Sequence, residues 1–282
     1  MRCVHYIFTA LLVLVLSATG AVAQDNSQLS PDLKNCTKVS LETSMGRIVV
    51  ALYNDTPIHR DNFLKLVKQG FYDGVLFHRV IKDFMIQTGD PASRTADSTA
   101  MLGSGGPGYD LLAEIVFPGH YHKRGALAAA RSGDQVNPNR HSSGSQFYIV
   151  TGARVTNQQL GMIEMKLGSQ MVQNTFVKLF EQHRDTLMQL YNAGDSTGLN
   201  NLEKQLAAQA KDYVDKNPAY YTSEMKKTYT TVGGTPHLDA QYTVFGEVVE
   251  GMDVVDKIQA VETNAADRPK TDVKILKATI VE

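Results

Sequence analysis

Hydrophobic and polar positions alternate along residues 38–43, and a second strand-like run follows over residues 48–53. A period of two residues indicates β-strands with one buried face. Ser44-Met45-Gly46 lies between the two runs and supplies residues that are typical of a turn. The pattern therefore predicts a β-hairpin at the start of the folded part of the chain.

A helical pattern comes next. Thr56-Pro57 is a typical helix start, because a hydroxyl side chain can cap the first turn and proline fits its first position. Phe63, Leu66 and Val67 then fall on one face, and Gly70 predicts the end of the helix.

Most of the remaining chain consists of short strand-like runs between polar loops. The runs occupy residues 75–80, 84–87, 125–130, 146–150, 242–248 and 273–281, and a short helix is predicted over 252–258. The loops 89–109 and 132–144 are rich in polar residues and glycine. Many short strands joined by such loops indicate a mainly β domain.

Residues from about 157 to 230 follow a helical period instead. Apolar side chains recur in two runs, and the polar segment 192–198 separates the runs. This pattern predicts a helical hairpin inserted into the β domain. Its apolar stripes have two interpretations: packing of the two helices on each other, which is the commoner use, or a groove for a partner. The stripes comprise Phe176, Phe180, Leu187, Leu190, Tyr191, Leu202, Leu206, Ala210 and Tyr213.

Residues 1–23 have the pattern of a secretion signal. Arg2 gives a positive start, an apolar run over residues 6–16 follows, and Ala21-Val22-Ala23 fits a cleavage site of small residues. The run is shorter than the roughly 20 residues of a spanning helix, which disfavours the alternative of an uncleaved N-terminal anchor. We therefore expect an exported protein, periplasmic or secreted, with a flexible leader over 24–37, a folded domain over 38–282 and no stable membrane insertion after cleavage.

The composition is that of a globular protein. Hydrophobic residues make up 43% and charged residues 20% of the 282 positions, so a sizeable core is expected. The formal net charge of -1 gives no support for nucleic-acid binding or for a basic membrane patch. Cys3 would leave with the signal, and Cys36 would remain as a single thiol, so no internal disulfide is expected.

Three motifs carry the candidate chemistry. They are Phe77-His78-Arg79-Val80-Ile81 with residues 84–90, then residues 143–149, then Leu238-Asp239 with residues 242–248. In this order they closely resemble the signature segments of the cyclophilins, which are peptidyl-prolyl cis-trans isomerases, and the resemblance covers roughly residues 38–155 and 232–282. It implies a closed eight-stranded antiparallel β-barrel capped by helices. It also implies a cofactor-free enzyme that isomerises X-Pro bonds in unfolded or exported polypeptides.

The catalytic role that the resemblance gives to Arg79 agrees with elementary chemistry. Rotation about an X-Pro bond has a barrier of about 18–20 kcal/mol, which arises from amide resonance. In the twisted amide the prolyl nitrogen regains a lone pair and can accept a hydrogen bond. A fixed guanidinium is a suitable donor, because it stays charged and presents a rigid fork. By resemblance Arg79 is that donor, and Gln87 helps to hold the substrate and Arg79. Without this motif, a surface arginine in a salt bridge would be an equally good interpretation of Arg79.

The same resemblance assigns the substrate-binding positions. Phe84, Met85, Tyr148 and Leu238 match the apolar pocket, although ordinary core packing is the alternative for such residues. Gln146 matches a polar site position, and Ala130 and Arg131 match a segment whose backbone pairs with the substrate. The chain departs from the family at His237 for Trp, Tyr242 for His, Tyr148 for Phe and Arg131 for Asn. These departures bear on sequence preference rather than on the reaction.

Other readings have less support. The main alternative is a non-catalytic module that binds proline-containing segments or acts as a chaperone; retention of Arg79 with Gln87 favours the enzyme. A hydrolase is disfavoured because no nucleophile–base arrangement is visible. The glycine-rich residues 103–108 lack the ending of a phosphate-binding loop. His120 and His122 have no further ligands at metal-binding spacing, so no metal is expected.

Overall fold

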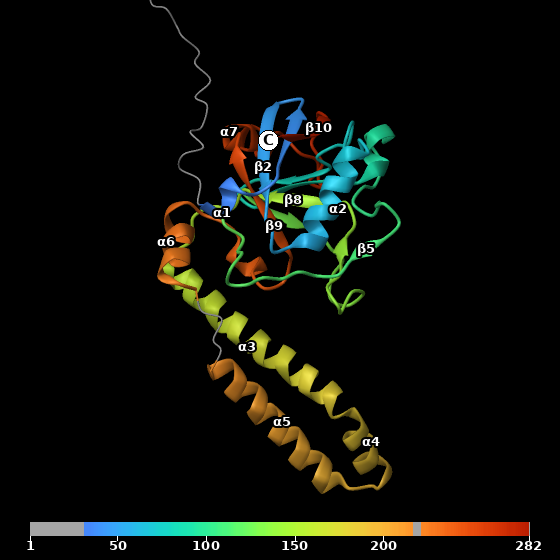
Figure 1. The fold of residues 1–282 in the computed structure, drawn as a ribbon, viewed down its shortest axis with the longest axis vertical. Helices are drawn as coiled ribbons and strands as arrows, with labels where there is room; N and C mark the ends of the chain where they lie inside the picture. The colour runs from blue at the N-terminus through green and yellow to red at the C-terminus, as the bar shows by residue number, and fades with distance from the viewer. Residues whose placement is uncertain (1–30, 217–220, 282) are drawn as a thin grey trace, which may run out of the picture.

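The computed structural model describes residues 31–216 and 221–281. It shows a β-sheet body from which a long helical arm projects (Figure 1). The predicted signal peptide and residues 24–30 of the predicted leader lie outside the described residues. The short helix α1 (Pro31–Lys34) lies within the remainder of that leader.

The body is built on one antiparallel sheet of eight strands. In spatial order these are β10 (Ile275–Val281), β1 (Lys38–Thr43), β2 (Gly46–Leu52), β9 (Val244–Glu250), β6 (Ala126–Ala129), β8 (Phe147–Val150), β4 (Met85–Thr88) and β3 (Arg79–Ile81). The predicted hairpin is confirmed, since β1 and β2 pair from Lys38 opposite Ala51 to Thr43 opposite Gly46. Two short strands, β5 (Asp110–Leu111) and β7 (Ser142–Ser143), form a second small sheet.

The expectation of a closed barrel is wrong, because the sheet is an open half-barrel with β3 and β10 as its edges. The two edges approach each other only before β3 begins. There the backbone N–H groups of Gly74 and Phe77 donate to the carbonyls of Ile275 and Val273, at 2.7 and 2.9 Å. Beyond these bonds, the three-residue strand β3 pairs with β4 and is too short to form a ladder along β10.

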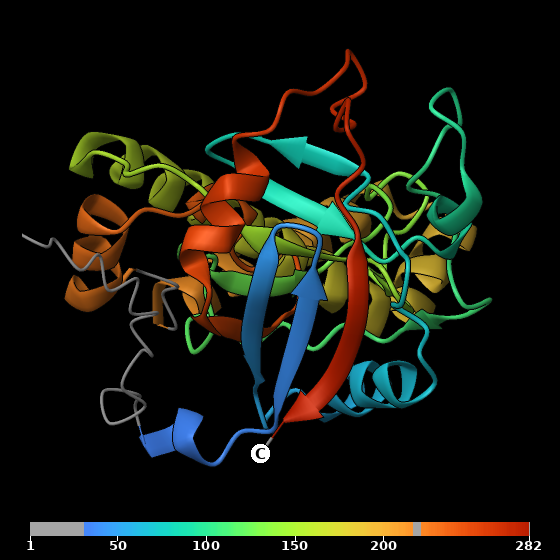
Figure 2. The same cartoon turned by 90° about the horizontal axis from the view of Figure 1, so that it is seen from above.

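Two helices lie on opposite sides of the β1–β2 hairpin (Figure 2). These are α2 (Pro57–Lys68), which packs against β10, and α7 (Met252–Gln259), which packs against β2, β3 and β4. Phe63 of α2 enters the main core, where its ring contacts those of Tyr72, Phe147 and Phe245. This core fills the concave side of the sheet with apolar side chains that are almost completely buried.

The start of α2 is capped differently from the prediction. The Thr56 hydroxyl makes no capping bond and donates instead to the carbonyl of Tyr53. The carboxylate of Glu114 accepts from the backbone N–H groups of Ile58 and His59, at 3.0 and 2.9 Å. Glu114, which is 55 positions from His59 along the chain, therefore caps the helix start in place of Thr56.

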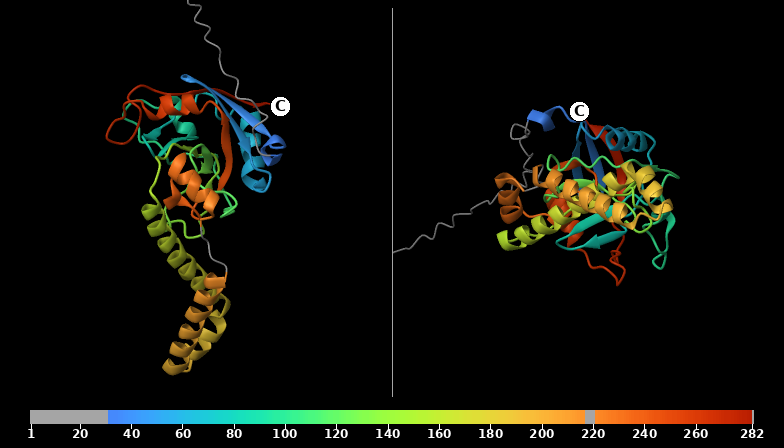
Figure 3. Two further views of the ribbon diagram at one scale, coloured as in Figure 1. Left: turned by 90° about the vertical axis from the view of Figure 1, so that its left-hand side faces the viewer. Right: turned by 90° about the horizontal axis from the view of Figure 1, so that it is seen from below.

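Four helices occupy the segment for which a helical hairpin was predicted. They are α3 (Asn157–Gln182), α4 (Arg184–Asn192), α5 (Ser196–Lys216) and α6 (Ser223–Thr231). The first three form the arm, and α6 returns to the body (Figures 1 and 3). Leu206 and Ala210 of α5 are fully buried along the arm, which supports packing of its helices on each other. Within the described ranges, no helix is long and apolar enough to cross a membrane.

Candidate functional site

Three neighbouring strands place predicted site residues in one row. Arg79 on β3 lies directly opposite Gln87 on β4, and Gln87 lies opposite Tyr148 on β8. Residues that face each other across antiparallel strands point to the same face of the sheet. The pairing therefore brings the guanidinium, the amide and the phenol ring together, although they are up to 69 residues apart in the chain.

Hydrogen bonds hold the polar part of this row. Arg79 Nη1 donates to Gln87 Oε1 at 3.4 Å, and Gln87 Nε2 donates to Gln146 Oε1 at 3.1 Å. Gln146 Nε2 donates in turn to the carbonyls of Gly103 and Gly105, at 2.9 and 2.7 Å. The chain of bonds fixes which way each amide points, so the Gln87 oxygen faces the guanidinium.

Arg79 is held in place but remains open to solvent. Its side chain is 42% exposed, and its Nε lies 3.7 Å from a carboxylate oxygen of Asp267, which is about equally exposed. Such a surface ion pair stabilises the fold little. The remaining N–H groups of the guanidinium are therefore available to a bound molecule.

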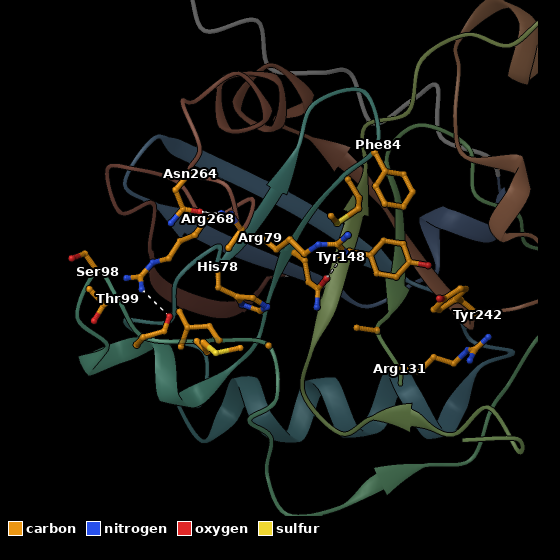
Figure 4. Close-up of a pocket in the computed structure, with 18 of the residues that line it drawn as sticks. His78, Arg79, Phe84, Ser98, Thr99, Arg131, Tyr148, Tyr242, Asn264 and Arg268 are labelled. Atoms are coloured by element: carbon orange, nitrogen blue, oxygen red, sulfur yellow. Dashed lines mark hydrogen bonds between the residues drawn. The ribbon is translucent and has the colours of Figure 1, made fainter. Parts of the chain in front are cut away.

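An apolar cavity adjoins Arg79 and Gln87. It has a volume of about 520 Å³ (Figure 4). Its lining includes four of the predicted pocket residues, namely Phe84, Met85, Tyr148 and Leu238. An apolar hollow with a few fixed polar groups is the usual form of a small-ligand site. This one can take an apolar ring next to a cationic hydrogen-bond donor.

Two other predicted residues lie beside this cavity rather than in it. His237 is not among the lining residues; its ring stacks on that of Phe84, with centroids 5.5 Å apart. Partial burial of the His237 ring lowers its pKa below the ordinary value for histidine. Gln146 lines a neighbouring cavity, whereas Gln87, Ala130 and Arg131 line both cavities.

The Arg131 side chain is used within the protein. It is only 3% exposed, and its Nε donates to the carbonyl of Gln241 at 2.9 Å. Its guanidinium lies 4.4 Å from the ring centroid of Tyr242, a cation–π contact that fixes this ring at the cavity edge. The backbone of Ala130 is also engaged, because its N–H donates to Gln146 and its carbonyl accepts from Ser143.

The cavity has a second half that the sequence reasoning missed. Residues 98–103 and the loop with Asn264, Ala266 and Arg268 line it together with His78. Arg268 is 7% exposed, and its Nη1 donates to the carbonyl of Asp97 at 2.6 Å, which ties the two loops together. The only sequence feature that pointed to this half of the cavity is the position of His78 next to Arg79 in the first motif.

His78 makes the stability of the fold sensitive to acid. Burial lowers its pKa from 6.5 to about 4, so the folded protein holds it neutral. The unfolded chain takes up this proton below pH 6.5, and the stabilisation present above that pH is lost as the pH falls towards 4. Between pH 7.5 and 4.5 the loss from His78 is on the order of 2–3 kcal/mol in the free energy of unfolding.

Urea unfolding at both pH values tests this expectation. His78→Gln should reduce the pH-dependent loss by roughly 2–3 kcal/mol relative to the wild type. Burial also lowers the pKa of His59 and of His237. The variant therefore keeps the pH-dependent loss of stability that these two histidines contribute. An unchanged pH dependence in His78→Gln would contradict the assignment.

The two histidines considered for a metal point to different partners. His120 Nε2 lies 2.7 Å from a carboxylate oxygen of Asp55, whereas His122 bonds to Asp239 and Tyr148. Among the residues that the structure describes, no group of three or more His, Cys, Asp or Glu side chains could hold a metal ion.

The sequence matches the model of one protein family, described as cyclophilin type peptidyl-prolyl cis-trans isomerase/CLD. The match covers residues 38–161 and 222–280, so it omits most of the helical arm. It contains every residue of the row and of the apolar cavity wall.

Similar proteins carry related names. A putative peptidyl-prolyl cis-trans isomerase of Staphylococcus saprophyticus is 28% identical over 257 residues, which are 90% of this chain and 98% of the relative. A putative bifunctional phosphatase/peptidyl-prolyl cis-trans isomerase of Streptococcus pyogenes is 30% identical over 94% of this chain. This chain spans only 43% of the length of that streptococcal relative.

Solved structures support the fold. A cyclophilin type peptidyl-prolyl cis-trans isomerase from Cryptosporidium parvum superposes with a TM-score of 0.52 at 20% identity, covering 88% of this chain and 98% of its own. The same parasite protein in the presence of the dipeptide Ala-Pro gives a TM-score of 0.51 at 19% identity. At this level of identity the likeness concerns the fold alone.

Proposed function

The chain belongs to the cyclophilin-type peptidyl-prolyl cis-trans isomerases, and from that premise we propose that it catalyses rotation about X-Pro bonds with Arg79 as the central catalytic group. One observation carries the assignment of the residue. Arg79 is the positively charged side chain that stands at the apolar cavity with Gln87 bonded to it.

The geometry suits the chemistry of the reaction. Phe84, Met85 and Leu238 line the same cavity as Arg79, and in the proposed complex they hold the proline ring with its nitrogen towards Arg79. Twisting the amide ends its resonance and returns a lone pair to this nitrogen, which then accepts a hydrogen bond from the guanidinium. The interaction is stronger in the twisted state than in either planar isomer, so it lowers the barrier. No bond is broken and no proton is transferred.

The test is a cis-trans exchange measurement on a short Xaa-Pro peptide by NMR or by a protease-coupled assay. The uncatalysed interconversion takes tens to hundreds of seconds. Catalytic amounts of the protein should shorten this time in proportion to enzyme concentration. A rate equal to that of the peptide alone would refute the proposal.

We also propose that the substrates are unfolded or exported polypeptides outside the cytoplasm. The support is the N-terminal pattern of Arg2, the apolar run and Ala21-Val22-Ala23. Mass spectrometry of the protein from its native cells should find a mature chain that starts at Gln24. A chain that still starts at Met1 in the soluble cytoplasmic fraction would contradict this.

Truncation of the pocket wall should weaken substrate binding. Phe84 contributes an aromatic face to the cavity, and burying such a side chain is worth about 1.5–3 kcal/mol. Phe84→Ala should therefore lower kcat/KM for an Xaa-Pro peptide roughly 10- to 100-fold, mainly through KM. Phe84→Leu should retain most of the activity, and an unchanged KM in Phe84→Ala would show that the ring does not hold the substrate.

A further inference from the structure

A line of buried polar side chains runs from the cavity wall to helix α6. The Tyr148 hydroxyl lies 3.0 Å from His122 Nε2, and His122 Nδ1 lies 2.9 Å from Asp239 Oδ1. The Tyr229 hydroxyl, on α6, donates to Asp239 Oδ2 at 2.6 Å. All four residues are at least 96% buried. Burying this many polar groups costs folding free energy unless each group has a hydrogen-bond partner. The four side chains therefore depend on one another for their partners.

For a neutral His122 ring, the protons in this line have one arrangement. The carboxylate of Asp239 can only accept, so His122 Nδ1 carries a proton towards it and Tyr229 donates from the other side. The backbone N–H of His122 also donates to Asp239, at 2.8 Å. Nε2 of the neutral ring then accepts from the Tyr148 hydroxyl. Burial raises the pKa of this hydroxyl well above its ordinary value, so the hydroxyl keeps its proton to donate.

A second contact ties the same part of the insertion to another residue that lines the cavity, Leu238. Tyr221, just before α6, donates from its hydroxyl to the carbonyl of Pro236 at 2.9 Å. Pro236 starts the short 3-10 helix η3 (Pro236–Leu238), which carries Leu238 into the cavity lining. The rings of Tyr221 and Tyr229 meet edge to face at 5.5 Å. Tyr229 and Tyr221 of the insertion therefore bond to Asp239, which holds His122 against Tyr148, and to Pro236, which precedes Leu238 by two residues.

The Tyr148 hydroxyl points away from Arg79. In Figure 4 the ring lines the cavity, and its hydroxyl lies on the side away from Arg79, towards Tyr242. The hydroxyl is bonded to His122 on the far side of the ring. Its effect on a bound proline must therefore act through the position of the ring.

We propose that Tyr229 of the helical insertion is a positioning residue for the proline pocket, acting through Asp239 and His122 to hold the Tyr148 wall in place. The insertion thereby sets how tightly the pocket binds proline-containing segments. This inference rests on the proposed function, because it names the residues that tune the same site. Tyr229 lies outside the cavity lining.

The test compares Tyr229→Phe, Tyr148→Phe and the double variant in the full-length protein. Each single variant removes one hydroxyl and keeps the ring, and each should raise KM for an Xaa-Pro peptide about 3- to 10-fold with kcat within about twofold. The double variant should be no worse than the more affected single variant, because both changes break one line of bonds. Tyr191→Phe is the matched control, since Tyr191 lies on α4 and is 71% exposed, and it should leave KM unchanged.

Two further readouts separate positioning from a loss of stability and from failure of the proposed function. Nitrogen-15 NMR of the His122 ring should show the Nδ1–H tautomer in the wild type and a changed tautomer balance in Tyr229→Phe. Titration with the peptide should show weaker binding in Tyr229→Phe even if the wild type proves inactive, in which case only the proposed function fails. Unchanged KM and peptide affinity in Tyr229→Phe, or effects that add in the double variant, would overturn the inference.

Discussion

Replacing Arg79 with alanine is expected to lower kcat/KM for an Xaa-Pro peptide roughly 100- to 1,000-fold. The reason is that the proposed mechanism makes Arg79, which lines the cavity and bonds to Gln87, the donor to the prolyl nitrogen of the twisted amide. Removing one such preorganised donor from an enzyme costs about 2.7–4 kcal/mol of transition-state stabilisation. The effect should fall mainly on kcat, because the planar substrate gains little from this bond.

Two companion variants make the Arg79 experiment specific. Arg79→Lys keeps the charge and loses the planar fork, so it should retain only a small part of the rate. Arg47→Ala removes a guanidinium of similar exposure, on β2 and paired with Glu42, and should leave the rate unchanged. The Arg79 side chain is 42% exposed, so the variant should fold normally. A full rate in Arg79→Ala would place catalysis elsewhere.

The row formed by Arg79, Gln87 and Tyr148 could be predicted largely from sequence, because short motifs carry its residues. Arg79 and Gln87 belong to one hairpin, where local alternation already places them on the same side of two strands. Tyr148 joins the row only through the pairing of β4 with β8, and no periodicity within either strand specifies that register. Resemblance, rather than strand pattern, supplied this third member.

The features that sequence reasoning missed depend on contacts between distant segments. His122 and Asp239 are 117 positions apart and bond only because the chain, returning from the arm, pairs at residues 233–235 with residues 122–124. His122 was therefore considered only with its chain neighbour His120 as a metal ligand. The openness of the barrel also depends on where β3 and β10 diverge in space, which no short window of sequence contains.

Phe147 and Tyr148 are adjacent in β8 but serve different sides of the sheet. Phe147 is 1% exposed in the main core, with its ring edge-on to those of Phe63 and Tyr72. Tyr148 lines the cavity on the other face. Phe147→Ala should therefore lower the free energy of unfolding by about 3–5 kcal/mol, because it leaves a cavity in close-packed surroundings. Urea unfolding at neutral pH measures this loss.

The matched control and the activity of the variant decide whether this assignment of faces is right. Phe180→Ala removes the same ring from a position on the arm that is 40% exposed, and it should cost less than about 1 kcal/mol. The folded fraction of Phe147→Ala should retain kcat/KM within a few-fold, since the face of β8 that lines the cavity keeps its side chains. A loss below 1 kcal/mol for Phe147→Ala would mean that Phe147 does not face the main core. A selective rise in KM would mean that the two faces of β8 are not independent, and the wall at Tyr148 would then depend on the core as well as on the helical insertion.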